Sequence, residues 1–171
     1  EGWHEMRKDP SEAELAASPS EFRQLDDTRF FVRQSADVHH AAGLDCIDCH
    51  TALEVMGTGQ TVAHKAQALR VRCEDCHVST GGKLATRELT STDPESRKIL
   101  ALRGWTLQPG ERLGATRSGD TLVNVRVDAQ GHGQLLRKAD GRAAPLKPQA
   151  AACAKGGAHA RLTCSSCHTA W

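Results

Sequence analysis

The stretch HHAAGLDCIDCH, residues 39–50, contains two cysteines that are separated by two residues and followed directly by a histidine. The same pattern occurs twice more, as CEDCH at residues 73–77 and as CSSCH at residues 164–168. Cys-x-x-Cys-His is the pattern of c-type haem attachment. Two thiols at this spacing can reach the two vinyl groups along one haem edge, and the adjacent imidazole can then turn onto the iron. The sequence therefore predicts three covalently attached haem c groups.

This interpretation assigns a role to six of the seven cysteines and to three of the nine histidines. The expected thioether-forming residues are Cys46, Cys49, Cys73, Cys76, Cys164 and Cys167. The expected proximal iron ligands are His50, His77 and His168. The seventh cysteine, Cys153, has no partner at haem spacing, which leaves it as a free thiol or as one half of a disulfide with another chain or segment.

Two other kinds of site use Cys-x-x-Cys pairs. A single copy is also typical of a thioredoxin-like redox pair or of half a zinc site. The first two pairs are about as far apart as those of a zinc ribbon. A ribbon would leave the third pair unused, and four thiolates need no histidine at a fixed position. With 9 His in 171 residues, three such histidines arise by chance with odds on the order of 1 in 10,000.

The second axial ligand of each iron is expected to be histidine, because only Met6 and Met56 could supply a thioether instead. Three histidines precede the motifs by short intervals, and a tether this short favours ligation of a neighbouring haem. They are His40, His64 and His159, with His39 competing with His40 and with His4 available near the start of the sequence. For any one of them, the alternative is a surface or hydrogen-bonded imidazole.

Composition and charge exclude several other functions. The formal charge is +1, with 22 basic and 21 acidic residues spread along the chain, so a nucleic-acid surface is not expected. No apolar run approaches the roughly 18 residues of a membrane span. The chain has three Phe, three Trp and no Tyr, so large aromatic side chains for a core are scarce.

With its three motifs and upstream histidines, the sequence resembles the large multihaem c-type cytochromes of metal- and mineral-respiring bacteria. The resemblance covers residues 39–80 and 153–171, including HARLTCSSCHTAW at 159–171. It implies a periplasmic or extracellular bacterial location and closely spaced irons with two histidine ligands each. It also implies that this chain is a fragment of a longer protein, or one module of a series.

We expect an irregular, haem-organised α+β fold, with short helices around the haems and little regular secondary structure. An N-terminal segment, 1–37, would pack on a two-haem region, 38–98, and 149–171 would carry the third haem. Between them, turn signals at Pro109-Gly110, Ser118-Gly119 and Asp140-Gly141 separate short apolar runs, which predicts an inserted β-hairpin region without haem at 99–148. The best strand candidate is TLVNVRV, residues 121–127.

The expected function is electron transfer rather than enzymatic catalysis, with other redox proteins or further haem modules as partners and no nucleic acid. Two alternatives stay open. One is a reductase of nitrogen or sulfur oxyanions with one open iron, and the other is a subunit of a polymeric cytochrome filament in which a terminal histidine such as His4 ligates the next subunit.

Intact-mass measurement of protein from a host competent in cytochrome maturation is expected to show the polypeptide plus three haems. The residual mass would report the state of Cys153. A colourless preparation, or one containing zinc in place of iron, would contradict the motif interpretation.

Overall fold

The computed structural model describes residues 3–33, 36–79, 81–90, 93–153 and 163–164. These residues form two compact units, one ending at Leu44 and the other running from Asp45 to Cys164. Among the described helices, none has the length and apolar character needed to cross a membrane.

The first unit is built on a small antiparallel sheet with the strand order β1-β3-β2. Its elements are β1 (Trp3–Glu5), α1 (Glu12–Ala17), a 3-10 turn (Pro19–Glu21), β2 (Phe22–Gln24), β3 (Phe30–Arg33) and α2 (Val38–Ala41). Helix α1 begins at Ser11, whose side chain accepts the backbone N–H of Glu14 while the Glu14 carboxylate accepts the N–H of Ser11. This reciprocal capping satisfies two of the amides that a helix start leaves unpaired.

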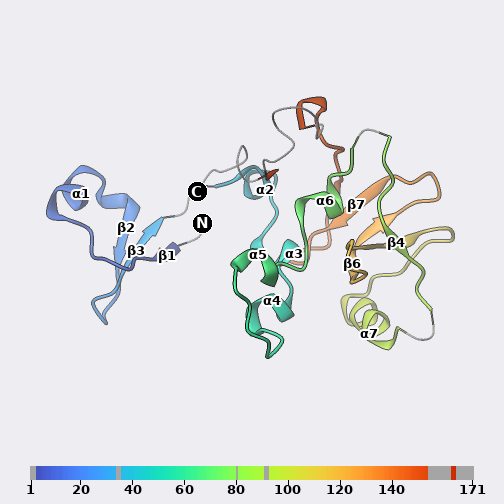
Figure 1. The fold of residues 1–171 in the computed structure, drawn as a ribbon, viewed down its shortest axis with the longest axis horizontal. Helices are drawn as coiled ribbons and strands as arrows, with labels where there is room; N and C mark the ends of the chain where they lie inside the picture. The colour runs from blue at the N-terminus through green and yellow to red at the C-terminus, as the bar shows by residue number, and fades with distance from the viewer. Residues whose placement is uncertain (1–2, 34–35, 80, 91–92, 154–162, 165–171) are drawn as a thin grey trace. The chain divides into compact units, whose positions relative to one another are not determined.

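The second unit combines four very short helices with a five-stranded antiparallel sheet in the order β4-β5-β6-β7-β8. Figure 1 shows α3 to α6 gathered beside this sheet. The elements are α3 (Cys46–Cys49), α4 (Ala52–Met56), α5 (Lys65–Ala68), α6 (Cys73–Cys76), β4 (Thr86–Arg87), α7 (Pro94–Arg103), β5 (Arg112–Ala115), β6 (Thr121–Val127), β7 (Gly133–Leu136), β8 (Ala143–Pro145) and a 3-10 turn (Ala151–Cys153).

The hydrophobic core of the second unit belongs to the sheet. Leu113 on β5 and Val125 on β6 are essentially inaccessible to solvent, and Leu100 of α7 is also buried. Helix α7 begins at Asp93, whose carboxylate accepts the N–H of Ser96, and ends at Gly104, which adopts the left-handed conformation (φ 64°). The residues at both ends of helix α7 are therefore ones that favour a helix start and a helix end.

The expected fold class was wrong. The chain is not mainly irregular structure wrapped around haems, because it is a mixed α+β fold with two hydrogen-bonded antiparallel sheets. The two β-sheets therefore give the chain more regular secondary structure than the haem motifs led us to expect. The apolar run at 99–102 lies in helix α7 rather than in a hairpin, since Asp93 and Pro94 start a helix ahead of it.

Glycine is required at position 114, where β5 crosses the irregular part of β6. The register between these strands shifts between Leu113 and Gly114. A Cβ at residue 114 would lie 2.5 Å from Cγ1 and 2.7 Å from Cβ of Val125, which no real packing allows. The missing side chain lets the two strands approach each other over the buried Val125.

Gly114→Ala is therefore expected to lower the free energy of unfolding by about 3 kcal/mol, because the methyl group overpacks the core. The matched control is Gly57→Ala in the loop after α4, where a Cβ meets nothing within 4 Å but the backbone has φ +77°. That control is expected to cost about 1 kcal/mol from backbone strain alone. Denaturant unfolding of both variants measures the difference, and equal losses would contradict the packing argument.

Candidate haem-attachment sites

The first two motifs have the same local structure. In each, a single helical turn begins at the first cysteine and ends at the second, and the histidine follows as the residue that ends the helix. The thiols of Cys46 and Cys73 are exposed, and those of Cys49 and Cys76 are half-buried. None of these four cysteines forms a disulfide bond. Of the third motif, Cys164 lies within the described residues, and Cys167 and His168 lie outside them.

Asp48, the residue before the second cysteine of the first motif, is buried and holds the motif on the sheet. One carboxylate oxygen accepts the N–H of Asp45, at the start of α3, at 2.9 Å. The other accepts the N–H of Lys138, in the hairpin between β7 and β8, at 2.6 Å. The backbone carbonyl of Asp48 also accepts the side-chain amide of Asn124 on β6, at 3.1 Å. The first motif is thereby fixed to the sheet by hydrogen bonds from the β7–β8 hairpin and from strand β6.

Asp75 makes the equivalent contacts in the second motif and is equally buried. One oxygen accepts the N–H of Arg72, at the start of α6, at 2.8 Å. The other accepts the N–H of Arg117, in the hairpin between β5 and β6, at 2.9 Å. A buried carboxylate is stable only when its oxygens are hydrogen-bonded, and both oxygens of both aspartates are used in this way.

The two motif histidines each direct Nδ1 at an oxygen acceptor. His77 Nδ1 lies 2.8 Å from the backbone carbonyl of Lys147, and His50 Nδ1 lies 3.4 Å from Oε2 of Glu54. The Lys147 carbonyl can only accept, so a hydrogen bond from Nδ1 of His77 leaves the lone pair of Nε2 available to a metal. The contact between His50 and Glu54 is an ion-pair contact and orients the His50 ring in the same sense. Metal-bound histidines are oriented in this way by a partner of the second ring nitrogen. Both side chains thus fit an axial iron ligand.

Glu54, on α4, connects the first motif with the chain that leads into the second. Its carboxylate accepts the N–H of Thr51 at 2.7 Å, that of Val71 at 3.3 Å and that of Arg70. The side chain is only 6% exposed. Burial opposes ionisation, but these backbone donors outweigh it and lower the pKa of Glu54. The carboxylate beside His50 is therefore charged at neutral pH.

Thiols of different motifs lie close to one another. Cys73 is within hydrogen-bonding reach of Cys164, and Cys49 is near enough to Cys76 to affect its ionisation. Burial, together with the neighbouring Cys49 and Asp75, raises the pKa of Cys76 to about 12. Burial followed by the Cys164 thiol raises the pKa of Cys73.

The described side chains of the segment that carries both motifs include no buried apolar group. Among the side chains described between Asp45 and His77, the buried ones are Asp48 and Asp75 and none is apolar. Four large apolar side chains there are exposed: Ile47, Met56, Val62 and Leu69. A porphyrin has two large apolar faces, and covering such side chains with it would remove their surface from water. The thiols of Cys46 and Cys73, the Nδ1 contacts of the two histidines and the exposed apolar side chains together fit covalent haem.

The predicted distal histidines are distributed over both units. His39 and His40 lie on α2 and His4 lies on β1, all exposed and all in the first unit. His64 precedes α5 in the second unit and is exposed. His159 lies outside the described residues. The structure therefore tests none of the proposed distal pairings.

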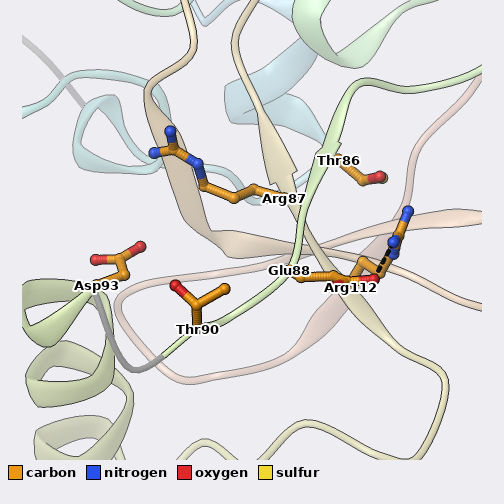
Figure 2. A pocket seen from close by; sticks show the side chains of 6 residues that line it. All are labelled: Thr86, Arg87, Glu88, Thr90, Asp93 and Arg112. Atoms are coloured by element: carbon orange, nitrogen blue, oxygen red, sulfur yellow. Dashed lines mark hydrogen bonds and ion pairs between the residues drawn. The ribbon is translucent and has the colours of Figure 1, made fainter.

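A hollow of about 520 Å³ opens at the edge of the sheet where β4 meets β5, and its chemistry differs from that of the motifs. Figure 2 shows its lining: Thr86, Arg87, Glu88, Thr90, Asp93 and Arg112. Arg112 pairs with Glu88, and the Asp93 carboxylate accepts Thr121 Oγ1 at 3.3 Å. The lining contains neither His nor Cys, so it cannot ligate a haem iron through either residue type.

Sequence reasoning missed Asp48, Asp75 and Glu54. A signal was present, because both of the first two motifs have aspartate directly before the second cysteine, three residues after the helix start. An acidic residue at that position is typical of a helix cap. The bonds to the hairpins had no signal, since they join residues 90 and 42 positions apart.

No protein-family model matches this chain, and neither does any curated protein or solved structure that was compared with it.

Glu54→Ala is expected to lower the free energy of unfolding by about 1–3 kcal/mol, because buried backbone amides lose their acceptor. Hydrogen exchange should become faster in the peptide that contains Arg70 and Val71. Glu95→Ala, on the exposed face of α7, is the control and should leave that peptide unchanged. Unaltered protection in Glu54→Ala would show that this carboxylate does not hold the loop.

Proposed function

We propose that this chain is an electron-transfer multihaem c-type cytochrome that carries three covalent haems, each iron ligated by histidine on both faces. The observation that carries the proposal is the threefold Cys-x-x-Cys-His pattern. It is supported by the cysteines of the first two motifs, which form no disulfide, and by the Nδ1 contacts of His50 and His77. It is also supported by the uncovered apolar side chains of residues 45–77.

The roles of this chain's residues follow from the donor set. In each motif the two thiols would hold the haem through thioether bonds, and the histidine would supply an axial nitrogen ligand. When bound, the haem supplies a reversible one-electron change at iron, and the protein tunes it through its ligands and their partners. The carboxylate of Glu54 beside His50 makes that ring more electron-rich than His77, whose partner is a neutral carbonyl, so we expect the first iron to be the more easily oxidised.

Charge points to the class of partner. Three haems bring two propionates each, which changes the formal charge from +1 to about −5. A negative surface favours docking with positively charged redox proteins and makes that docking sensitive to salt. Haem attachment of this kind follows export, so the proposed location is the periplasm or the cell exterior, with further haem modules as additional partners.

The spin state of the oxidised protein tests the ligand set. We expect only low-spin haem signals in visible and electron paramagnetic resonance spectra, because histidine on both faces gives a strong ligand field at each iron. A high-spin haem that shifts on addition of nitrite or sulfite would instead support a reductase with an open iron.

A pair of cysteine variants ties those signals to the motifs. Cys73→Ala combined with Cys76→Ala should remove one haem mass, whereas Cys153→Ala should retain all three. Three haems in the double variant would exclude the second motif as an attachment site.

A further inference from the structure

The two aspartate-bound motifs are attached to the same end of the five-stranded sheet. The strands β5, β6, β7 and β8 are consecutive and antiparallel, so the β5–β6 and β7–β8 hairpins lie at one end and the β6–β7 hairpin at the other. Asp75 binds the β5–β6 hairpin and Asp48 binds the β7–β8 hairpin. The two attachment points are thus set by the sheet.

Strand order also sets the distance between the β5–β6 hairpin and the β7–β8 hairpin. Neighbouring strands lie about 4.8 Å apart, and β5 and β7 are separated only by β6, so the two hairpins are about 10 Å apart. The sheet has a packed core, whereas no described apolar side chain of residues 45–77 is buried, so the sheet is the rigid partner.

Additional bonds strengthen each attachment. The Lys138 ammonium donates to the carbonyl of Ile47, inside the first motif. Arg70, just before the second motif, pairs with Asp120 at the end of the β5–β6 hairpin. Each motif is therefore held by its hairpin through both a backbone amide and a charged side chain.

We propose that the haem-free sheet is a spacer that fixes the relative position of the first two haems, with Asp48 and Asp75 as its positioning residues. The inference rests on the proposed function, since it concerns haems bound at those motifs. Each aspartate is adjacent to a haem-binding cysteine and two residues before the proximal histidine, so moving it moves the whole attachment turn. The third motif has Ser166 at this position and lacks the two-oxygen acceptor.

The spacing matters because electron transfer between cofactors slows steeply as their separation grows. A four-residue helix is far too short to hold its own conformation in water. Without the hairpin bonds, the two attachment turns would move independently and the haem-to-haem geometry would vary. The sheet removes that freedom.

Asp48→Asn and Asp75→Asn test the proposal in the haem-loaded protein. Asparagine keeps the shape but has one oxygen, so its amide faces a second N–H donor and one of the two bonds is lost. Interacting haems give a two-signed circular dichroism signal in the Soret band whose size depends steeply on their separation and angle. Each variant is expected to lose amplitude in this signal while retaining three haems by mass and low-spin spectra.

Asp128→Asn is the matched control. Asp128 also accepts two backbone amides, those of Gln130 and His132, but in the β6–β7 hairpin at the opposite end of the sheet. Its variant carries the same charge change and should keep the full Soret signal. A full Soret signal in the Asp48→Asn and Asp75→Asn variants would overturn the spacer role. The same loss of signal in Asp128→Asn as in those two variants would also overturn it. A chain without haem mass would instead refute the proposed function itself.

If either motif variant proves too unstable to load haem, Asn124→Ala gives a second test. Asn124 donates to the carbonyl of Asp48 from β6 without contacting the carboxylate. Its loss should loosen the first motif only, and reduce the Soret signal less than Asp48→Asn does. An Asn124→Ala signal identical to that of the unaltered protein would count against the spacer role.

Discussion

Two buried carboxylates hold the second unit together. Asp48 and Asp75 each divide their two oxygens between the start of a one-turn helix and the backbone of a hairpin. The cost of burying these groups is offset only because every oxygen has a donor. Without them, two short turns would lack both a cap and a tertiary contact, since helices of four residues are not stable alone.

The unit therefore has two parts with different sources of stability. The sheet is stabilised by its own apolar core around Leu113 and Val125. Residues 45–77 depend on polar bonds to that sheet, on Glu54 and on the surface that haem would cover. This division explains why so few aromatic residues suffice in the chain, because the cofactors are expected to supply the large flat apolar groups that the sequence lacks.

Local patterns predicted some of this fold and long-range bonds decided the rest. Strand β6 has the bounds predicted from the alternation of residues 121–127, and the turns at Gly119 and Gly141 separate strands as expected. The prediction that residues 99–102 belong to a hairpin was wrong. Four apolar residues fit a strand or a helix equally, and the N-cap at Asp93 starts a helix here. The three-stranded sheet of the first unit was missed, since strands of three or four residues leave little periodicity to detect.

The candidate site also contains residues that could be predicted from sequence and residues that could not. The cysteines and motif histidines could be named as candidates from spacing alone, because the haem-attachment pattern spans only five residues. Asp48 and Asp75 could not be given their tertiary role, because the donors they bind are backbone amides, which any residue offers and no motif marks. Buried polar groups are informative only once their partners are known.

Glu54 shows how closely the two motifs are joined. The same carboxylate that faces Nδ1 of His50 also accepts the amides of Arg70 and Val71, directly ahead of the second motif. In the proposed cytochrome, a change in the charge on His50 would act on a carboxylate that is also hydrogen-bonded to the backbone directly ahead of the second motif. The sheet sets the distance between the motifs, and this carboxylate links the ligand of one to the position of the next.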